Sequence, residues 1–221
     1  FLKCPHWWRV FVTPEDSWWQ DVIQASEDIG VPCTAHTYRW HQNPYDNDYP
    51  HYFPAKIDYL NNVHHLQEKG IHVMPYINGR LWDTRDRGQE DYQFTSLAKP
   101  WATKVLDGGL YTETYAAREK DGSLVKNSIM CPTSALWQET QTNLVDRLFN
   151  EVGVDAVYID QVAAAKPILC VDEGHEHPTG GGNWWVQAYG RLLQHIRRVT
   201  PEDGALCSEC TGEAYMRSFT S

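Results

Sequence analysis

The sequence predicts an α/β fold of the (β/α)8 TIM-barrel class, with only about four to five of the barrel's βα units present. At Gly30, Gly70 and Gly153 an amphipathic helical stretch ends in glycine, and a β-branched run follows at once. A glycine at a helix end followed by a strand is typical of the joints in a parallel α/β sheet. The segments between each strand and the next helix are long, polar and aromatic, as on the catalytic rim of a barrel.

Strands and helices are predicted to alternate along the chain. The strands are short apolar runs at 31–37, 71–77, 154–159 and 205–208, with a further candidate at 9–13. The helices between them show the apolar period of 3.6 residues, at 14–29, 55–69, 134–152 and 183–199. No G-x-G-x-x-G turn opens a helix, which disfavours a dinucleotide-binding open sheet. Right-handed helix crossovers make all these strands parallel neighbours.

Residues 1–221 are predicted to form one partial catalytic barrel. A closed barrel typically needs eight strands and about 250 residues, whereas this chain has 221 residues. The remaining strands, and any accessory domains, are expected outside this chain. The first residues lack the pattern of a secretion signal. We therefore expect either a removed leader or an internal fragment, and an extracellular or periplasmic location.

The charge balance excludes several classes of partner. The chain has 19 Lys and Arg against 29 Asp and Glu, a net charge of −10, which repels nucleic acid. The best apolar run, 152–165, is interrupted by Asp155 and Asp160 and is too short to span a membrane. A neutral polymer such as an oligosaccharide is compatible with this charge.

Two of the predicted strands end in a carboxylate. The run 154–159 is followed by Asp160, and Glu209 follows the run 205–208. Because the strands are neighbours, both acids are expected to face one cleft, about 5–6 Å apart as in retaining glycosidases, or about 7–9 Å apart as in inverting ones. The alternatives are a divalent-cation site, or a structural Asp160 that caps the next turn or pairs with Arg80.

Aromatic and polar side chains follow the same strands. Aromatic rings pack on the C–H faces of sugars, although each ring taken alone more often packs in a core. Amide, guanidinium and imidazole groups interleaved with these rings suit vicinal hydroxyls. The predicted substrate contacts are Tyr38, Trp40, His41, Asn78, Arg80, Trp82 and His177.

The cysteines and histidines do not assign a metal site. Six cysteines in a chain with its own core do not indicate a disulfide scaffold. Cys207 is expected to be buried and not bonded to Cys210, because an extended chain separates their Cα atoms by about 10 Å. His175 and His177 lie beside acidic residues and could ligate zinc, but no third ligand is evident, and a hydrogen-bonding lid is the alternative. No metal and no cofactor are predicted.

The sequence resembles an uncharacterised bacterial family of glycoside-hydrolase-like TIM-barrel domains. The residues that carry this resemblance are Trp40, 49–54, 73–82, 130–132 and 157–161. More remotely, the sequence is similar to the superfamily of α-amylases, α-galactosidases and endo-α-N-acetylgalactosaminidases. The resemblance implies a nucleophile at Asp160, at the end of the fourth barrel strand, and an acid/base at Glu209. Tyr158 stands where amylases have an arginine, so amylase activity itself is not expected.

We therefore predict a retaining glycoside hydrolase with Asp160 as nucleophile and Glu209 as general acid/base, acting on an oligosaccharide, polysaccharide or glycoconjugate. Glu209 is expected to be the more desolvated acid or to face a second negative charge, and Asp160 to accept a hydrogen bond from Arg80 or Tyr38. The alternatives are a non-catalytic carbohydrate-binding or structural barrel, and a metal-dependent hydrolase built on the two loop histidines.

Overall fold

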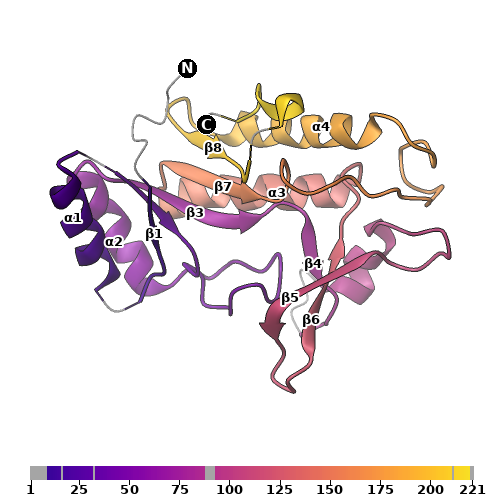
Figure 1. The fold of residues 1–221 in the computed structure, drawn as a ribbon, viewed down its shortest axis with the longest axis horizontal. Helices are drawn as coiled ribbons and strands as arrows, with labels where there is room; N and C mark the ends of the chain where they lie inside the picture. Colours follow the sequence, from indigo (N-terminus) through magenta and orange to yellow (C-terminus); the bar gives the residue numbers. More distant parts are fainter. Residues whose placement is uncertain (1–8, 16, 32, 88–92, 211, 220–221) are drawn as a thin grey trace.

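A parallel sheet forms the centre of the chain (Figure 1). The computed structural model describes residues 9–15, 17–31, 33–87, 93–210 and 212–219. The strands of the central sheet lie in the order β1-β2-β3-β7-β8. They are Arg9–Val12, Thr34–Thr37, His72–Asn78, Ala156–Asp160 and Ala205–Cys207. Each strand pairs in parallel with the next, so the predicted parallel neighbours with one common C-terminal edge are confirmed.

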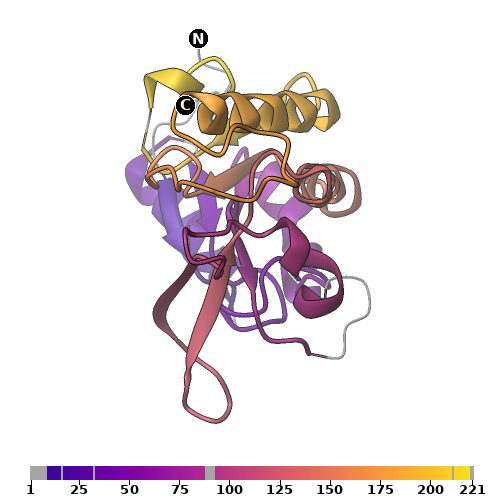
Figure 2. The ribbon, with the colours of Figure 1, turned by 90° about the vertical axis from the view of Figure 1, so that its right-hand side faces the viewer.

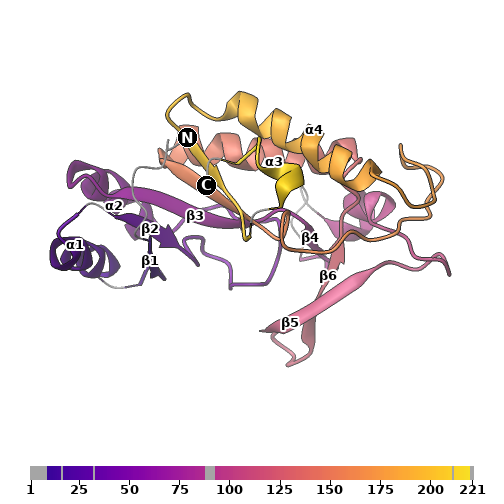
Figure 3. The ribbon, with the colours of Figure 1, turned by 45° about the horizontal axis from the view of Figure 1, so that its top comes forward.

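Helices connect these strands and cover one face of the sheet. They are α1 (Trp18–Ile29), α2 (Ile57–Glu68), α3 (Ala135–Arg147) and α4 (Trp184–Val199). α1 and α2 flank β1 and β2, and α3 and α4 lie along β7 and β8 (Figures 1 and 3). Because the strand order follows the chain and such crossovers are right-handed, the helices fall on the same face. The opposite face carries the candidate site.

The apolar pattern explains how α4 packs. Its buried residues are Trp184, Trp185, Ala188, Tyr189, Leu192, Leu193 and Ile196. This spacing places them on one stripe of a helix with 3.6 residues per turn. Arg197 and Arg198 occupy the last turn, where positive charge is favourable to the helix dipole. The helix therefore packs its apolar stripe inward and keeps its charges outside.

The predicted glycine joints are confirmed. Gly30, Gly70 and Gly153 have φ angles of 77°, 74° and 77°. Residues with a side chain rarely adopt this left-handed conformation, so glycine ends the helix and lets the chain enter the next strand. Before Gly153, α3 continues as a π-helical turn, η3 (Leu148–Val152). A short 3-10 helix, η4 (Glu213–Tyr215), follows β8.

A second, antiparallel sheet lies between β3 and α3 and was not predicted. Its strands are β4 (Leu81–Asp83), β5 (Thr112–Arg118) and β6 (Leu124–Ile129), in the order β4-β6-β5. The short helices η1 (Phe94–Ala98) and η2 (Lys99–Trp101) precede β5. Side chains on both faces of β5 are mostly exposed, so the strand lacks the apolar alternation that would reveal it. Figure 2 shows the β5–β6 hairpin projecting from the body.

The buried side chains form one core around the central sheet. Among the largest fully buried ones are Trp18, Trp40, Trp82 and Trp137. Cys207 is buried and Cys210 is exposed, and neither forms a disulfide bond, which confirms the prediction that they are not bonded to each other. None of the described helices combines the length and the apolar character needed to cross a membrane.

Candidate active site

The strand register brings both predicted carboxylates to one face of the central sheet. Tyr158 of β7 pairs with Tyr76 of β3 on one side and with Cys207 of β8 on the other. Positions two apart on a strand share a face. Asp160 therefore lies on the face of Tyr158, and Glu209, two residues after the end of β8, follows Cys207. This face is opposite to the one that the helices cover.

Aromatic rings line this face beside the carboxylates. The ring centroids of His36 and Tyr158 are 4.4 Å apart, those of Tyr38 and Tyr76 are 5.0 Å apart, and those of Tyr76 and Tyr158 are 6.1 Å apart. Phe11 lies 5.0 Å from His36 and is 65% exposed. Burial lowers the pKa of His36 to about 3, so this ring is neutral. The face is thus an aromatic floor suited to the C–H side of a sugar ring.

Asp160 has a hydroxyl donor and a second carboxyl group near it. The Tyr76 hydroxyl donates a hydrogen bond to Asp160 Oδ2 at 2.9 Å. The Glu209 carboxyl is near enough for its negative charge to act on Asp160. Burial is the main cause that raises the pKa of Asp160, to about 6. The negative charge of Glu209 adds to this increase, and the Tyr76 hydrogen bond opposes it.

The donor to Asp160 differs from the predicted one. Arg80 or Tyr38 is the predicted donor, but Tyr76 supplies the hydrogen bond. Tyr38 is nevertheless close to both acids: after burial, their charges are the main causes that raise its pKa. Tyr76 could have been found from the sequence, because it points to the same side of its strand as the position aligned with Asp160.

Of the two alternatives predicted for Glu209, greater desolvation is wrong, whereas a neighbouring negative charge is present in Asp160. Glu209 is exposed, whereas Asp160 is largely shielded from solvent.

The turn after β3 positions Asp160. Asn78 is 1% exposed, and its Oδ1 accepts hydrogen bonds from the backbone N–H groups of Arg80 and Leu81, both at 2.9 Å. The Gly79 N–H donates to the backbone carbonyl of Asp160 at 3.1 Å. A Cβ atom on Gly79 would lie 2.6 Å from each of two methyl carbons, so only glycine fits. The predicted sugar contact at Asn78 is instead an internal support for this turn.

Arg80 belongs to a polar network that the second sheet completes. Arg80 is 3% exposed, and its Nη1 lies 3.2 Å from Glu113 Oε1, while Nη2 donates to the Lys166 carbonyl at 3.2 Å. Tyr115 donates its hydroxyl proton to Glu113 at 2.8 Å, and Gln161 Nε2 donates to the Tyr115 hydroxyl oxygen at 2.7 Å. Arg80 pairs with Glu113 rather than with Asp160, so the alternative structural pairing is also excluded.

A pocket of about 520 Å³ lies beside Glu209. Its lining combines β5, the turn after β3 and the loop after β7: Arg80, Glu113, Thr114, Tyr115, Gln161, Ala164, Ala165, Lys166 and Glu209. These residues come from segments that lie far apart in the chain. The acidic rim and the buried guanidinium offer both acceptors and donors to hydroxyl groups.

Three of the predicted substrate contacts are core residues. Trp40 and Trp82 are 0% exposed, and His41 is 1% exposed. Trp40 Nε1 donates to the Tyr76 carbonyl at 2.8 Å, and the Trp82 ring lies 6.1 Å from that of Trp137. Burial lowers the pKa of His41 to about 4. The prediction that these side chains touch sugar is therefore wrong, because the segment after β2 packs Trp40 and His41 into the core and β4 places Trp82 beside Trp137.

His177 does not line the pocket beside Glu209. Its ring stacks on Trp184 with centroids 3.8 Å apart. It stands with Cys131, Cys170 and His175 in a group that could hold a metal ion. The structure thus supplies the further ligands that the local sequence around the two histidines lacks.

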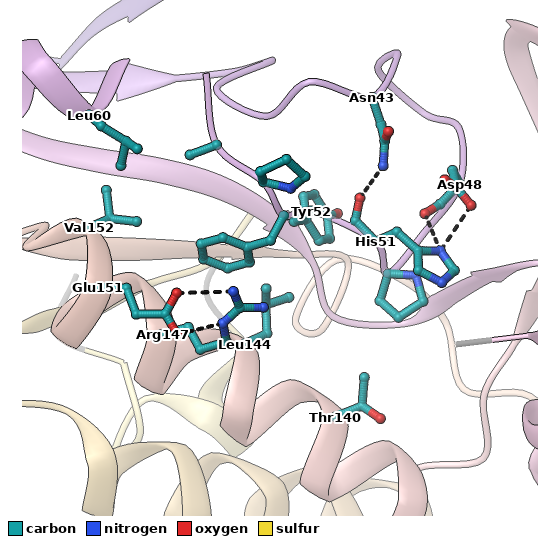
Figure 4. Close-up of a pocket in the computed structure, with 14 residues that line it drawn as sticks. Asn43, Asp48, His51, Tyr52, Leu60, Thr140, Leu144, Arg147, Glu151 and Val152 are labelled. Atoms are coloured by element: carbon teal, nitrogen blue, oxygen red, sulfur yellow. Dashed lines mark hydrogen bonds and ion pairs between the residues drawn. The ribbon is translucent and has the colours of Figure 1, made fainter. Parts of the chain in front are cut away.

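A separate pocket of about 540 Å³ lies between α2 and α3 (Figure 4). Arg147 lies over the Phe53 ring at 3.8 Å, and its Nε contacts Glu151 at 2.7 Å. Neither Asp160 nor Glu209 lines it. The two predicted catalytic carboxylates are therefore not part of this pocket.

Solved structures of glycosidases share this fold. The α-N-acetylgalactosaminidase NagBb of Bifidobacterium bifidum superposes with a TM-score of 0.71 at 14% identity, over 96% of this chain and 37% of that one. A GH31 sulfoquinovosidase of E. rectale gives 0.63 at 12% identity, over 96% and 32%. The α-galactosidase TtGalA of Thermus thermophilus gives 0.57 at 13% identity, over 94% and 41%. Identities this low establish the fold alone.

The sequence itself identifies the family. Residues 1–221 match the family described as "Domain of unknown function (DUF6259)", and the chain belongs to it. The chain is 35% identical over 199 residues to "Putative glycoside hydrolase" of Bacteroides thetaiotaomicron, and 32% identical over 209 residues to "Putative glycoside hydrolase 22789" of Monosiga brevicollis. These matches cover 90% and 88% of this chain but 28% and 17% of the relatives. The predicted resemblance to a glycoside-hydrolase-like family is confirmed.

Proposed function

We propose that this chain is the catalytic part of a retaining glycoside hydrolase. The observation that carries the proposal is the pair formed by Asp160 and Glu209, at the C-terminal ends of neighbouring parallel strands and on the aromatic face. The names of the relatives and the fold of the neighbours support it. We also propose that residues 1–221 are part of a (β/α)8 barrel, whose other strands lie elsewhere in the whole protein.

In the proposed mechanism the two acids act in sequence. An Asp160 carboxylate oxygen attacks the anomeric carbon, while Glu209 gives its proton to the glycosidic oxygen of the leaving group. The deprotonated Glu209 then takes a proton from a water molecule, which cleaves the glycosyl–Asp160 ester and restores both groups. Tyr76 holds the attacking carboxylate in place through its hydrogen bond. With a pKa of about 6, Asp160 is mostly ionised at neutral pH, as a nucleophile must be.

The proposed substrate is an α-linked hexopyranoside at the end of a glycan, handled outside the cytoplasm. The names of two neighbouring structures specify α-linked galactose or N-acetylgalactosamine. Tyr38 flanks both acids, and we propose that its ring contacts the sugar. Arg80 and Glu113 in the adjacent pocket supply hydrogen bonds to the neighbouring hydroxyl groups.

The test is turnover of aryl α- and β-glycosides of galactose and N-acetylgalactosamine by the full-length protein. NMR of the first product is expected to show retained configuration. Asp160→Asn is expected to lower kcat by about 10²–10⁴-fold on every substrate, and Glu209→Gln by a similar factor on glycosides whose leaving group needs protonation. The matched controls Asp203→Asn and Glu213→Gln change exposed acids outside the pocket and are expected to keep wild-type rates.

Substrates with different leaving groups distinguish the general acid, Glu209, from the nucleophile, Asp160. An aryl group that departs without protonation is expected to restore much of the rate of Glu209→Gln and none of that of Asp160→Asn, because only the first variant lacks the acid. A full-length protein that binds these glycosides but turns over none of them would favour the carbohydrate-binding barrel. Turnover that a chelator abolishes and Mg²⁺ or Ca²⁺ restores would favour a divalent cation held by the acid pair.

A further inference from the structure

The side chains of two cysteines and two histidines come together at the loop that follows β7. Cys131 lies between β6 and α3, and Cys170, His175 and His177 belong to the segment between β7 and α4. One sulfur or ring-nitrogen atom from each residue lies within 4.8 Å of those of the others. Both cysteines are 0% exposed, and His175 is 6% exposed. Two sulfurs and two imidazole nitrogens form a ligand set typical of zinc.

The hydrogen bonds of the two histidines orient them as metal ligands. His175 Nε2 lies 2.9 Å from the Pro100 carbonyl oxygen, and His177 Nδ1 lies 2.9 Å from that of Pro178. A carbonyl oxygen only accepts, so these nitrogens carry the proton and the other nitrogen of each ring presents a lone pair. His175 Nδ1 then lies 3.4 Å from Cys170 Sγ. His177 Nε2 is buried and has no hydrogen-bond partner in the described part of the chain.

The two sulfur atoms also have supporting donors. The backbone N–H of Lys104 donates to Cys170 Sγ at 3.4 Å, and the Thr133 hydroxyl lies 3.1 Å from Cys131 Sγ. Such contacts stabilise thiolates in metal sites and set the direction of the ligand lone pairs. Each sulfur ligand therefore has a hydrogen-bonding neighbour of the kind that orients ligands in metal centres.

We propose that Cys131, Cys170, His175 and His177 bind one Zn²⁺ in a closed tetrahedral site. With metal bonds of about 2.0–2.3 Å, the ligand atoms of such a site lie about 3.3–3.8 Å apart. The cluster reaches this geometry if its atoms move together by roughly 1 Å. Both thiols release their protons to solvent when the metal binds. Four protein ligands leave no open position, so the zinc is structural.

The zinc fastens the loop that forms one wall of the candidate active site. Lys166, in the same loop, accepts a hydrogen bond from Arg80 through its carbonyl, and it lines the pocket beside Glu209. Asp172 in this loop also contacts Lys104 Nζ at 2.6 Å. The site joins this wall to the end of β6. Metal binding itself does not depend on the proposed catalytic activity and is measured separately from it.

The experiment measures metal in the full-length protein, purified with reductant and without chelator. Elemental analysis by mass spectrometry is expected to find about one zinc per chain. Cys170→Ser and His177→Ala are expected to lose this zinc. The matched controls Cys210→Ser and His64→Ala, which change an exposed thiol and an exposed imidazole outside the cluster, are expected to retain it.

Cobalt substitution keeps the proposal testable if the variants do not fold. Chelated wild-type protein is expected to take up one Co²⁺ per chain, with the visible bands of a tetrahedral ion and a thiolate-to-cobalt charge-transfer band. Zinc is expected to displace the cobalt and to raise the thermal midpoint of the chelated protein. Reduced wild-type protein that takes up neither ion overturns the proposal. A Cys131–Cys170 disulfide in protein isolated without reductant also overturns it.

Discussion

The hydrogen bond between Tyr76 and Asp160 is expected to set the pH at which the proposed hydrolase becomes active. Tyr76→Phe removes the hydroxyl 2.9 Å from Asp160 Oδ2 and keeps the ring, which is 2% exposed. A hydrogen bond to a charged group contributes about 1.5–3 kcal/mol, and one pKa unit corresponds to about 1.4 kcal/mol. The pKa of Asp160, about 6 in the wild type, is therefore expected to rise by about one to two units.

The assay is the pH profile of kcat/KM, because its acidic limb reports the group that must be ionised in the free enzyme. The limb is expected near pH 6 in the wild type and about one unit or more higher in Tyr76→Phe. Tyr59→Phe is the matched control: it removes another buried hydroxyl, 3.0 Å from Thr37 Oγ1, on the helix side of the sheet. A limb that stays in place or moves down in Tyr76→Phe would refute the reasoning.

Three further predictions concern stability. Gly79→Ala is expected to lower the free energy of unfolding in urea by about 1–3 kcal/mol, because its Cβ would lie 2.6 Å from each of two methyl carbons. A Cβ on Gly180 would meet nothing within 4 Å, so Gly180→Ala is the control and is expected to change this free energy little. Trp40→Ala is expected to cost about 3–5 kcal/mol, and the surface change Leu106→Ala less than about 0.5; equal costs would contradict the core position of Trp40. Since folding raises the pKa of Asp160 to about 6, the folded state holds this proton more tightly than the unfolded one. The unfolding free energy of the wild type, relative to Asp160→Asn, is thus expected to fall by about 2 kcal/mol between pH 4 and 6, and a rise would contradict it.

The order of the main elements follows from local pattern. The predicted strands at 71–77 and 154–159 lie within two residues of β3 and β7 at both ends. A strand buried on both faces appears in the sequence as a continuous apolar run, and a glycine at the helix end marks where it starts. β5 was missed because its side chains are mostly exposed on both faces, so burial imposes no pattern on its sequence.

The two carboxylates of the candidate site could also be predicted from the sequence. Asp160 and Glu209 come directly after apolar runs, and the parallel register then brings them to one face. The environments of the two acids, in contrast, could not be predicted from the sequence. Which acid is the more buried depends on how Tyr76 and the neighbouring strands pack around Asp160, and Trp40 is in the core because its loop folds back onto the sheet.

The sequence by itself determined the parallel α/β order and the acids at two strand ends, because both follow from residues close together in the chain. Only the tertiary structure decided that Glu113 and Tyr115 of β5 border the pocket. It also brought Cys131 to the loop of His175 and His177. These contacts join residues far apart in the chain, and no local periodicity constrains such pairs. Their meeting is set by the register of the strands and by how the long loops pack against them.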